Sequence, residues 1–399
     1  MKTDLDALLA AARERQAELL PLLRDWCAVN SFTGNIPGVN AVGEALVRAL
    51  DLRGLHHERQ PGNGVGDHHF WCTPAFRTAP PARRVMLLGH HDTVFPPGTF
   101  EAWEETPTLI RAPGVLDMKG GLAVIRTALA ALADLGTLAD VPVGFASVAD
   151  EETSSLDSAP WLRSLAAGAG AALVFESGRA EDAIITRRKG TGRIGLTVSG
   201  RAAHAGNNLA DGINAIVALA RVIDRLAELG VPERGVTLNV GTIRGGESVN
   251  TVPAHAEAVV DFRVERAEDA RALLAQVDAI ATEVAVRTGA VIAVGGGLRR
   301  PPLERTEASA ALRQAYAECA GAAGLGNGEA ALLGGGSDAN TVSAIGVPAI
   351  DGLGPRGKGF HTHDECIEPS TLGPKVEALL RFLAGVYGSD PKAYTPRPC

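Results

Sequence analysis

The chain is organised around one stretch, Val85-Met86-Leu87-Leu88-Gly89-His90-His91-Asp92-Thr93-Val94. Its first four residues are apolar, which is typical of a buried strand in a parallel sheet. Such sheets carry their functional groups just beyond the carboxyl ends of the strands, where the two histidines stand. Residues two apart in a strand share a face, so we expect His90 and Asp92 to point together and His91 to point away. A histidine backed by a carboxylate indicates a metal ligand, and an ordinary polar strand end is the alternative.

The composition excludes several classes of protein. The 399 residues are enough for two domains with separate cores, and 46% of them are hydrophobic while 21% are charged, which is typical of a globular chain and not of a disordered one. The formal net charge of −8 argues against a nucleic-acid partner, because phosphate binding requires clustered lysine and arginine.

The cysteines and the first residues indicate a cytoplasmic protein. An odd number of cysteines without a C-x-x-C spacing predicts free thiols, and neither a disulfide framework nor a thiolate zinc site. The early residues are acidic, and the apolar run after them is broken at Arg13 and Glu14. Neither a signal peptide nor a membrane span fits this pattern, so no membrane partner is expected. The five cysteines are Cys27, Cys72, Cys319, Cys366 and Cys399.

The order of the expected elements indicates two domains, one inserted into the other. Apolar strands alternate with helices before residue 190 and again after residue 302, which predicts an α/β domain with a mostly parallel sheet flanked by helices. Between residues 191 and 301 the pattern becomes βαββαβ, the order of a ferredoxin-like α+β unit. We therefore expect a catalytic domain of residues 1–190 and 302–399, and an inserted domain of residues 191–301.

Acidic residues follow two further strands of the first domain. Residues 141–148 are apolar and lead into Asp150-Glu151-Glu152, and residues 171–175 lead into Glu176. Asp117 precedes a helix and could be only its N-cap. The pair Gly120-Gly121 at that helix start indicates a close approach to the backbone, since two glycines there are otherwise destabilising. Three strands that end in His, Glu and Glu favour a metal site over a solvated surface.

The candidate ligands contain imidazoles and carboxylates but no thiolates. This donor set suits a pair of hydrolytic Zn²⁺, Co²⁺ or Mn²⁺ ions. One carboxylate must then bridge the two ions. His363 is a rival ligand because it lies two residues from His361, and we interpret the adjacent His68 and His69 as structural. The candidates are His90, Asp92, Asp117, Glu151, Glu152, Glu176 and His361.

These residues belong to an ordered set of motifs that resembles the M20 metallopeptidases, the family of carboxypeptidase G2-like enzymes, acetylornithine deacetylase and succinyl-diaminopimelate desuccinylase. Each motif alone is weak, but the set in this order is specific. The motifs are Gly89-His90-His91-Asp92-Thr93-Val94, Gly114-Val115-Leu116-Asp117-Met118-Lys119-Gly120-Gly121, Asp150-Glu151-Glu152, Phe175-Glu176, Gly200-Arg201-Ala202-Ala203-His204-Ala205-Gly206, Asn250-Thr251-Val252-Pro253, Gly334-Gly335-Gly336-Ser337-Asp338 and Phe360-His361.

The resemblance implies a role for each matching position of the first domain. Asp117 would bridge two metal ions and would be followed by a cis peptide bond to Met118. One ion would be completed by His90 and Glu176, the other by Glu152 and His361. Asp92 would orient His90, and Glu151 would be the general base that takes a proton from the bridging water and delivers it to the leaving amine.

The inserted domain resembles the lid and dimerisation domain of the family, which implies a homodimer. His204 would reach into the partner's site and stabilise the oxyanion, with help from Asn250. Arg263 would bind the substrate carboxylate, although a strand-surface ion pair is the alternative. The backbone of Gly335 and Gly336 would line the substrate pocket.

The function implied is that of a dinuclear zinc metallopeptidase that cleaves a peptide or N-acyl amide bond next to a free carboxylate. An N-acyl-amino-acid deacylase or deacetylase on the same site is the alternative. The lysine that carboxypeptidase G2-like enzymes carry after the Glu176 position has no clear match, because this chain has Asp182-Ala183-Ile184 there. Glutamate specificity is therefore left open.

Overall fold

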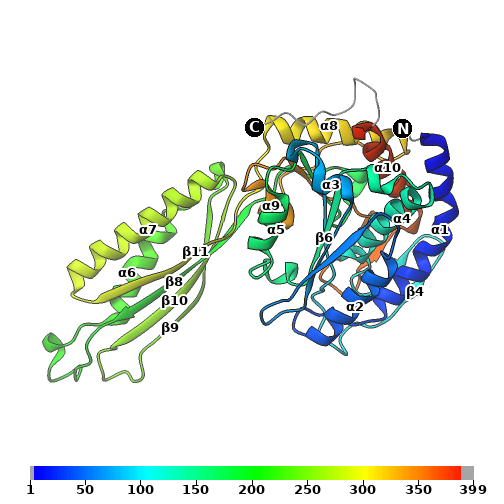
Figure 1. Cartoon of the computed structure of the whole chain (residues 1–399). Helices are drawn as coiled ribbons and strands as arrows, with labels where there is room; N and C mark the ends of the chain where they lie inside the picture. The colour runs from blue at the N-terminus through cyan, green and yellow to red at the C-terminus, as the bar shows by residue number, and fades with distance from the viewer. Residues whose placement is uncertain (1–3, 388–399) are drawn as a thin grey trace. The chain divides into compact units, whose positions relative to one another are not determined.

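The computed structural model describes residues 4–387, which divide into two compact units (Figure 1). Unit 1 comprises residues 4–187, 305–332 and 337–387, and unit 2 comprises Arg188–Glu304 and Leu333–Gly336. The boundaries expected from the sequence, at residues 190/191 and 301/302, lie a few residues from these. The sequence did not indicate that the short glycine segment before Ser337 groups with the inserted unit.

Unit 1 is built on a six-stranded sheet of order β1-β2-β6-β3-β7-β12. The pairs β6-β3, β3-β7 and β7-β12 are parallel, whereas β1 and β2 are antiparallel at one edge. Every residue of β3, β6 and β7 is buried, because these strands have helices on both faces. The strands are β1 His56–Gln60, β2 His68–Cys72, β3 Val85–His90, β6 Val143–Val148, β7 Ala171–Val174 and β12 Ala349–Ile350. A mostly parallel α/β sheet is thus confirmed.

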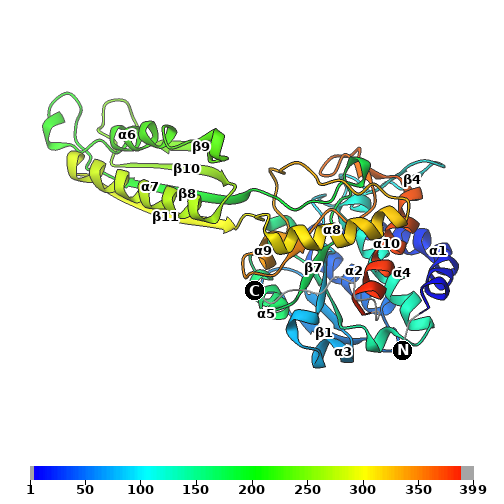
Figure 2. The same cartoon turned by 90° about the horizontal axis from the view of Figure 1, so that it is seen from above.

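Helices cover both faces of this sheet. Figures 1 and 2 show α5 and α9 on one side and α4, α1 and α10 on the other. The alanine-rich α4 is buried from Gly120 to Leu132 and packs between α1 and α10. The helices are α1 Leu5–Cys27, α2 Ile36–Ala49, α3 Pro74–Thr78, α4 Gly120–Asp134, α5 Ala159–Ala166, α8 Glu307–Ala322, α9 Asp338–Ser343 and α10 Leu372–Tyr387.

A second, small sheet of order β13-β14-β5-β4 joins segments that are far apart in the chain. Its strands are β4 Glu104–Glu105, β5 Ile110–Arg111, β13 Gly357–Lys358 and β14 Cys366–Ile367. The antiparallel pair of β5 and β14 brings the segment before Asp117 beside the segment that carries His361. Two candidate ligands that are remote in sequence are positioned by this pairing.

Unit 2 is an antiparallel sheet of order β11-β8-β10-β9 with two helices on one face (Figure 2). Along β8, Ile194, Leu196 and Val198 are buried under the helices, whereas Arg193 and Thr197 are exposed on the other face. The elements are β8 Gly190–Ser199, α6 Ala215–Ala227, β9 Thr237–Gly245, β10 His255–Val264, α7 Ala267–Thr288 and β11 Val291–Arg300. The expected βαββαβ order is confirmed.

The described cysteines form no disulfide bond with one another, and the described helices are not suited to crossing a membrane. Cys27, Cys72, Cys319 and Cys366 are free thiols, as expected, and Cys399 lies outside the described residues. Between residues 4 and 387, none of the helices combines the length and the apolar character needed to cross a lipid bilayer.

The glycines at the start of α4 are explained by close packing, as the sequence indicated. A Cβ added to Gly121 would lie 2.0 Å from the carbonyl oxygen of Phe175, and one added to Gly120 would lie 2.6 Å from Pro355 Cγ. The helix therefore approaches the end of β7 more closely than any side chain would allow.

We predict that Gly121→Ala lowers the free energy of unfolding by about 1–3 kcal/mol, because a methyl group cannot fit against the Phe175 carbonyl. The matched control is Gly385→Ala in α10, where an added Cβ has no atom within 4 Å. This control is expected to be as stable as the wild type or slightly more so. Urea unfolding of the three proteins checks this, and equal losses in both variants would contradict it.

Candidate metal centre

His90 stands at the carboxyl end of β3, and its ring is held from behind by Asp92. The His90 side chain is 1% exposed, and its Nδ1 lies 3.0 Å from the Asp92 carbonyl oxygen and 3.3 Å from Asp92 Oδ1. Asp92 accepts a hydrogen bond of 2.7 Å from Thr33 Oγ1 and bonds of 3.3 Å from the backbone N–H groups of Glu151 and Glu152. Asp92 therefore ties the end of β3 to the end of β6 and leaves His90 Nε2 directed at the acidic group.

Asp117 lies between two imidazoles. His90 Nε2 is 3.3 Å from Asp117 Oδ1 and 3.6 Å from Glu176 Oε1. His361 Nε2 is 3.3 Å from Asp117 Oδ2 and 3.1 Å from Glu152 Oε2. One oxygen of Asp117 thus faces each histidine, which is the geometry that a carboxylate shared by two cations requires. The peptide bond from Asp117 to Met118 is cis, as the resemblance implied.

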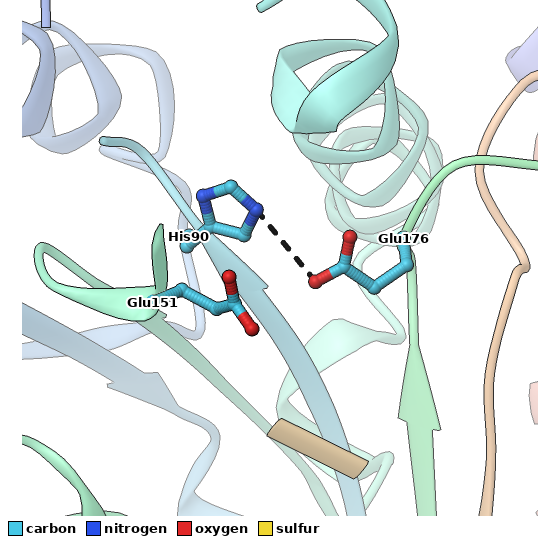
Figure 3. A group of neighbouring side chains, drawn as sticks. All are labelled: His90, Glu151 and Glu176. Atoms are coloured by element: carbon cyan, nitrogen blue, oxygen red, sulfur yellow. Dashed lines mark ion pairs between the residues drawn. The ribbon is translucent and has the colours of Figure 1, made fainter. Parts of the chain in front are cut away.

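The adjacent glutamates Glu151 and Glu152 both have a carboxylate oxygen near His90. Potential ligand atoms of His90, Glu151 and Glu176 lie within 4.8 Å of one another, and so do those of His90, Asp117 and Glu152. Figure 3 shows the first group, with its three side chains pointing toward one another from the end of β3, the turn after β6 and the segment after β7. The distances allow Glu151 to act as a ligand or as a base beside the ligands.

The pKa values of two glutamates and of His361 are raised in this group, whereas the pKa of Asp117 is lowered. Burial raises the pKa of Glu152 to about 7, and repulsion from Asp117 adds to this. The same two causes raise the pKa of Glu176 to about 7. For Asp117, hydrogen bonds from His361 and His90 outweigh burial and hold its pKa well below the usual range. Bonds to Asp117 and Glu152 raise the pKa of His361 to about 10. The cluster therefore attracts positive charge.

The residues fit a pair of divalent cations. The Glu152 side chain is only 6% exposed, and its Oε1 is buried without a hydrogen-bond partner among residues 4–387. A buried, unsatisfied carboxylate oxygen is strongly unfavourable unless a cation neutralises it. Imidazole and carboxylate donors without thiolates suit Zn²⁺, Co²⁺ or Mn²⁺.

Glu365 belongs to this centre, although no motif in the sequence indicated a role for it. It is fully buried and accepts hydrogen bonds from the backbone N–H groups of Gly114 (3.1 Å), Leu116 (2.8 Å) and Asp117 (3.0 Å). Burial raises the pKa of Glu365 to about 8. The loop of His361 therefore anchors the loop of Asp117. The only feature of the sequence that could have indicated this role of Glu365 is its position directly before the apolar pair Cys366-Ile367.

A cation and an aromatic ring flank His361. The Phe360 ring contacts the His361 ring edge-on at a centroid distance of 5.4 Å, and the guanidinium carbon of Arg179 lies 5.2 Å from the Phe360 centroid. Phe360 is 41% exposed. This stack places apolar surface and positive charge beside a candidate ligand, and sequence reasoning assigned no role to Arg179.

Other histidines of unit 1 have different surroundings. His91 points away from the cluster, as expected, and its Nδ1 lies 2.9 Å from Ser147 Oγ. The ring of His363 stacks on Phe100 at 5.5 Å, so within the described residues it is His361 that meets the carboxylates. His68 and His69 are both buried and hydrogen-bonded, to Asp157 and His57 respectively, which agrees with a structural role.

In unit 2, His204 lies on an exposed turn between β8 and α6. Its Nδ1 accepts hydrogen bonds of 3.1 Å from the backbone N–H groups of Gly206 and Asn207. These donors fix the tautomer with the proton on Nε2, so that this N–H points outward as a donor. The carbonyl oxygen of Asn250 accepts a bond of 2.9 Å from the Ala205 N–H, which connects Asn250 to the same turn.

The remaining predicted residues of unit 2 are Arg263, Gly335 and Gly336. Arg263 forms two hydrogen bonds to Asp261, of 2.9 and 3.1 Å, which is the ion pair weighed above as the alternative to substrate binding. The carbonyl oxygen of Gly335 accepts a bond of 3.2 Å from Arg188. Gly336 lies against the Arg300 side chain, where a Cβ would come within 2.5 Å.

Comparisons with known proteins identify relatives of the whole chain. Residues 186–289 match the peptidase dimerisation domain of the M20 type. Carboxypeptidase G2 of Pseudomonas sp. (strain RS-16) is 26% identical over 392 residues, which cover 95% of this chain and 91% of that protein. A probable carboxypeptidase of Ajellomyces dermatitidis is 29% identical over 296 residues, which cover 63% of this chain and 64% of that protein.

Solved structures share the fold. The aminopeptidase PepT of Bacillus cereus superposes with a TM-score of 0.75 at 22% identity, covering 93% of this chain and 98% of that one. The YXEP protein of Bacillus subtilis, a dinuclear metal binding peptidase from the M20 family, gives a TM-score of 0.68 at 15% identity, again covering 93% and 98%.

We predict that Glu365→Gln weakens binding of divalent cations by about 10–100-fold, because an amide places an N–H group against the backbone donors that position Asp117. Competition with a chromophoric chelator measures the affinity. Hydrogen exchange at the amides of residues 114, 116 and 117 is expected to become faster.

Glu18→Gln is the control for this change, because Glu18 of α1 pairs with Arg15 of the same helix and with Arg126 of α4. It should leave cation affinity at the wild-type value. Wild-type affinity in Glu365→Gln would show that the Glu365 anchor does not matter to the centre.

Proposed function

The chain contains an M20 peptidase dimerisation domain and is a homologue of carboxypeptidase G2, and from this premise we propose that it is a metal-dependent amide hydrolase. Its substrate is a peptide or N-acyl amino acid with a free carboxylate next to the scissile amide bond. The observation that carries the proposal is the buried group of imidazoles and carboxylates at the carboxyl ends of β3, β6 and β7. Parallel sheets have their active sites at this edge.

The proposed ligands would hold two cations, and Asp117, which has one oxygen near each histidine, would contribute to both. When bound, such cations polarise a scissile carbonyl and lower the pKa of an attacking water. This chain's own contribution is to hold the donors in place through Asp92 and Glu365, which fix the two loops and the end of β3. The proposed ligands are His90, Asp117, Glu152, Glu176 and His361.

Glu151 is proposed as the general base. Its side chain belongs to the same group as His90 and Glu176, and the residue is 9% exposed, so that it is shielded from solvent but close to the reacting atoms. Its backbone is fixed by the bond to Asp92. Glu151 takes a proton from water and passes it to the leaving amine.

His204 is proposed to donate a hydrogen bond from its Nε2–H to the oxyanion of the tetrahedral intermediate. The two backbone donors at Nδ1 support this role, because they hold the ring in the required tautomer before substrate arrives. The dimerisation domain suggests a homodimer, and we propose that His204 serves the site of the partner subunit. Asn250 supports the turn, and Arg263 is proposed to exchange Asp261 for a substrate carboxylate.

The substrate class is decided by the acyl group and the side chain next to the carboxylate. In the segment where carboxypeptidase G2-like enzymes carry a lysine, this chain has Asp182, which is buried and pairs with Arg356 at 2.9 Å and Lys375 at 3.2 Å. A panel of C-terminal dipeptides and N-acetyl and long-chain N-acyl amino acids separates carboxypeptidase from deacylase activity.

We propose a cytoplasmic location, where the free thiols remain reduced.

We predict that Glu151→Gln binds both cations but loses turnover by at least about 100-fold, because it keeps the side-chain shape and removes the base. Metal content and kcat of the purified variant check this. Turnover close to the wild-type value would exclude Glu151 as the base, and loss of a cation would make it a ligand instead.

We predict that His204→Ala is folded and inactive, and that mixing it with Glu151→Gln restores activity under subunit exchange. A mixed dimer then has one site with both an intact Glu151 and an intact His204, so recovery up to about a quarter of wild-type activity is expected for random exchange. Dimer formation is verified separately by sedimentation. A mixed dimer without any recovered activity would rule out a role across the subunit interface.

A further inference from the structure

The face of the unit 2 sheet that carries no helices has a hollow of about 470 Å³. It lies over β8 and β11, at the edge of the sheet opposite β9. Neither the metal centre nor the residues proposed above for substrate binding line it. The lining residues are Arg193, Gly195, Thr197, Ala293, Val294, Gly295, Gly296, Gly297, Leu298 and Arg299.

The hollow exists because glycines replace side chains at paired positions of the two strands. Gly195 of β8 is directly opposite Gly295 of β11, and Arg193 is opposite Gly297. A Cβ added to any of these three glycines would have no atom within 4 Å, so no neighbouring packing requires them to be small. The hollow is therefore open because the sequence places glycines, which have no side chain, on this face of the sheet.

Two arginines, Arg193 and Arg299, are among the residues that line the hollow, and no acid is among them. Arg299 is the extra residue of a bulge, because Leu298 pairs with Gly192 and Arg300 pairs with Thr191. Bulges re-aim side chains and are frequent beside functional sites. Both Arg193 and Arg299 are exposed.

The acid that lies opposite Arg193 in the sheet is already engaged. Asp261 is the cross-strand partner of Arg193 on β10, but both of its oxygens accept bonds from Arg263. Within residues 4–387 no ion pair involves Arg193 or Arg299. Two like charges held on one face without counter-ions attract an anion.

We propose that this hollow binds a small molecule that carries a carboxylate or phosphate group. Guanidinium groups bind both anions in a bidentate manner, and the Thr197 hydroxyl at the rim is a further donor. The volume is in the range of small-molecule sites, and the exposed glycines let a ligand lie directly on the backbone. None of the proposed metal ligands lines this site, but Asp261 connects the two regions, because it lies opposite Arg193 and bonds to Arg263.

The test is calorimetric titration of the full-length, metal-loaded protein with glutarate and, separately, with inorganic phosphate. Arg193→Gln and Arg299→Gln are each expected to weaken binding by about tenfold or more, since each removes a charged hydrogen-bond donor. Gly195→Val adds a side chain within the hollow at a position where a Cβ would have no described atom within 4 Å, and it should also abolish this binding while the protein stays folded. The tighter of the two anions identifies the ligand class.

Arg244→Gln is the matched control, because Arg244 lies on the same face at the far edge of the sheet and is 79% exposed. It should leave binding unchanged. The proposal is overturned if the wild type binds neither anion, if Arg193→Gln and folded Gly195→Val both bind like the wild type, or if Arg244→Gln weakens binding equally. Anion binding at the metal centre persists in all of these variants and is thereby distinguished.

Discussion

Repulsion between buried carboxylates is the constraint on which the rest of this structure depends. Asp117, Glu152 and Glu176 meet within a few ångströms of two imidazoles, and burial together with their mutual charge raises the pKa values of both glutamates to about 7. Water cannot relieve this repulsion, because the side chains are buried. A bound proton or a cation relieves it, and the imidazole and carboxylate donors of the centre suit a pair of divalent cations.

The surrounding fold holds these groups against their repulsion. Asp92 joins the end of β3 to the turn after β6, and Glu365 joins the His361 loop to the three amides before and at Asp117. Close packing of Gly121 on Phe175 sets the start of α4 against the end of β7. Each contact connects segments that are remote in sequence, so the centre is assembled only when the whole of unit 1 is folded.

The parts of this fold that follow local patterns were predictable. Apolar runs ending in His90, Glu151 and Glu176 indicated β3, β6 and β7 and the edge of the sheet where their side chains meet. The succession of strand and helix patterns in the inserted segment indicated its βαββαβ order. Long-range pairing was not predictable. The polar β1 is an exposed edge strand without the apolar pattern of a strand, and two-residue strands such as β5 and β14 are defined only by each other. Glu365 was missed for the same reason, since its donors lie about 250 residues away.

The most direct test of the metal centre is the number of cations bound per chain, measured by mass spectrometry of the full-length protein after loading with Zn²⁺, Co²⁺ or Mn²⁺ and removal of free metal. Two cations per chain are expected in the wild type. Asp117→Ala should retain at most one, because Asp117 offers an oxygen to each side of the centre. A wild-type chain that retains none, or an Asp117→Ala variant that retains both, would contradict the account.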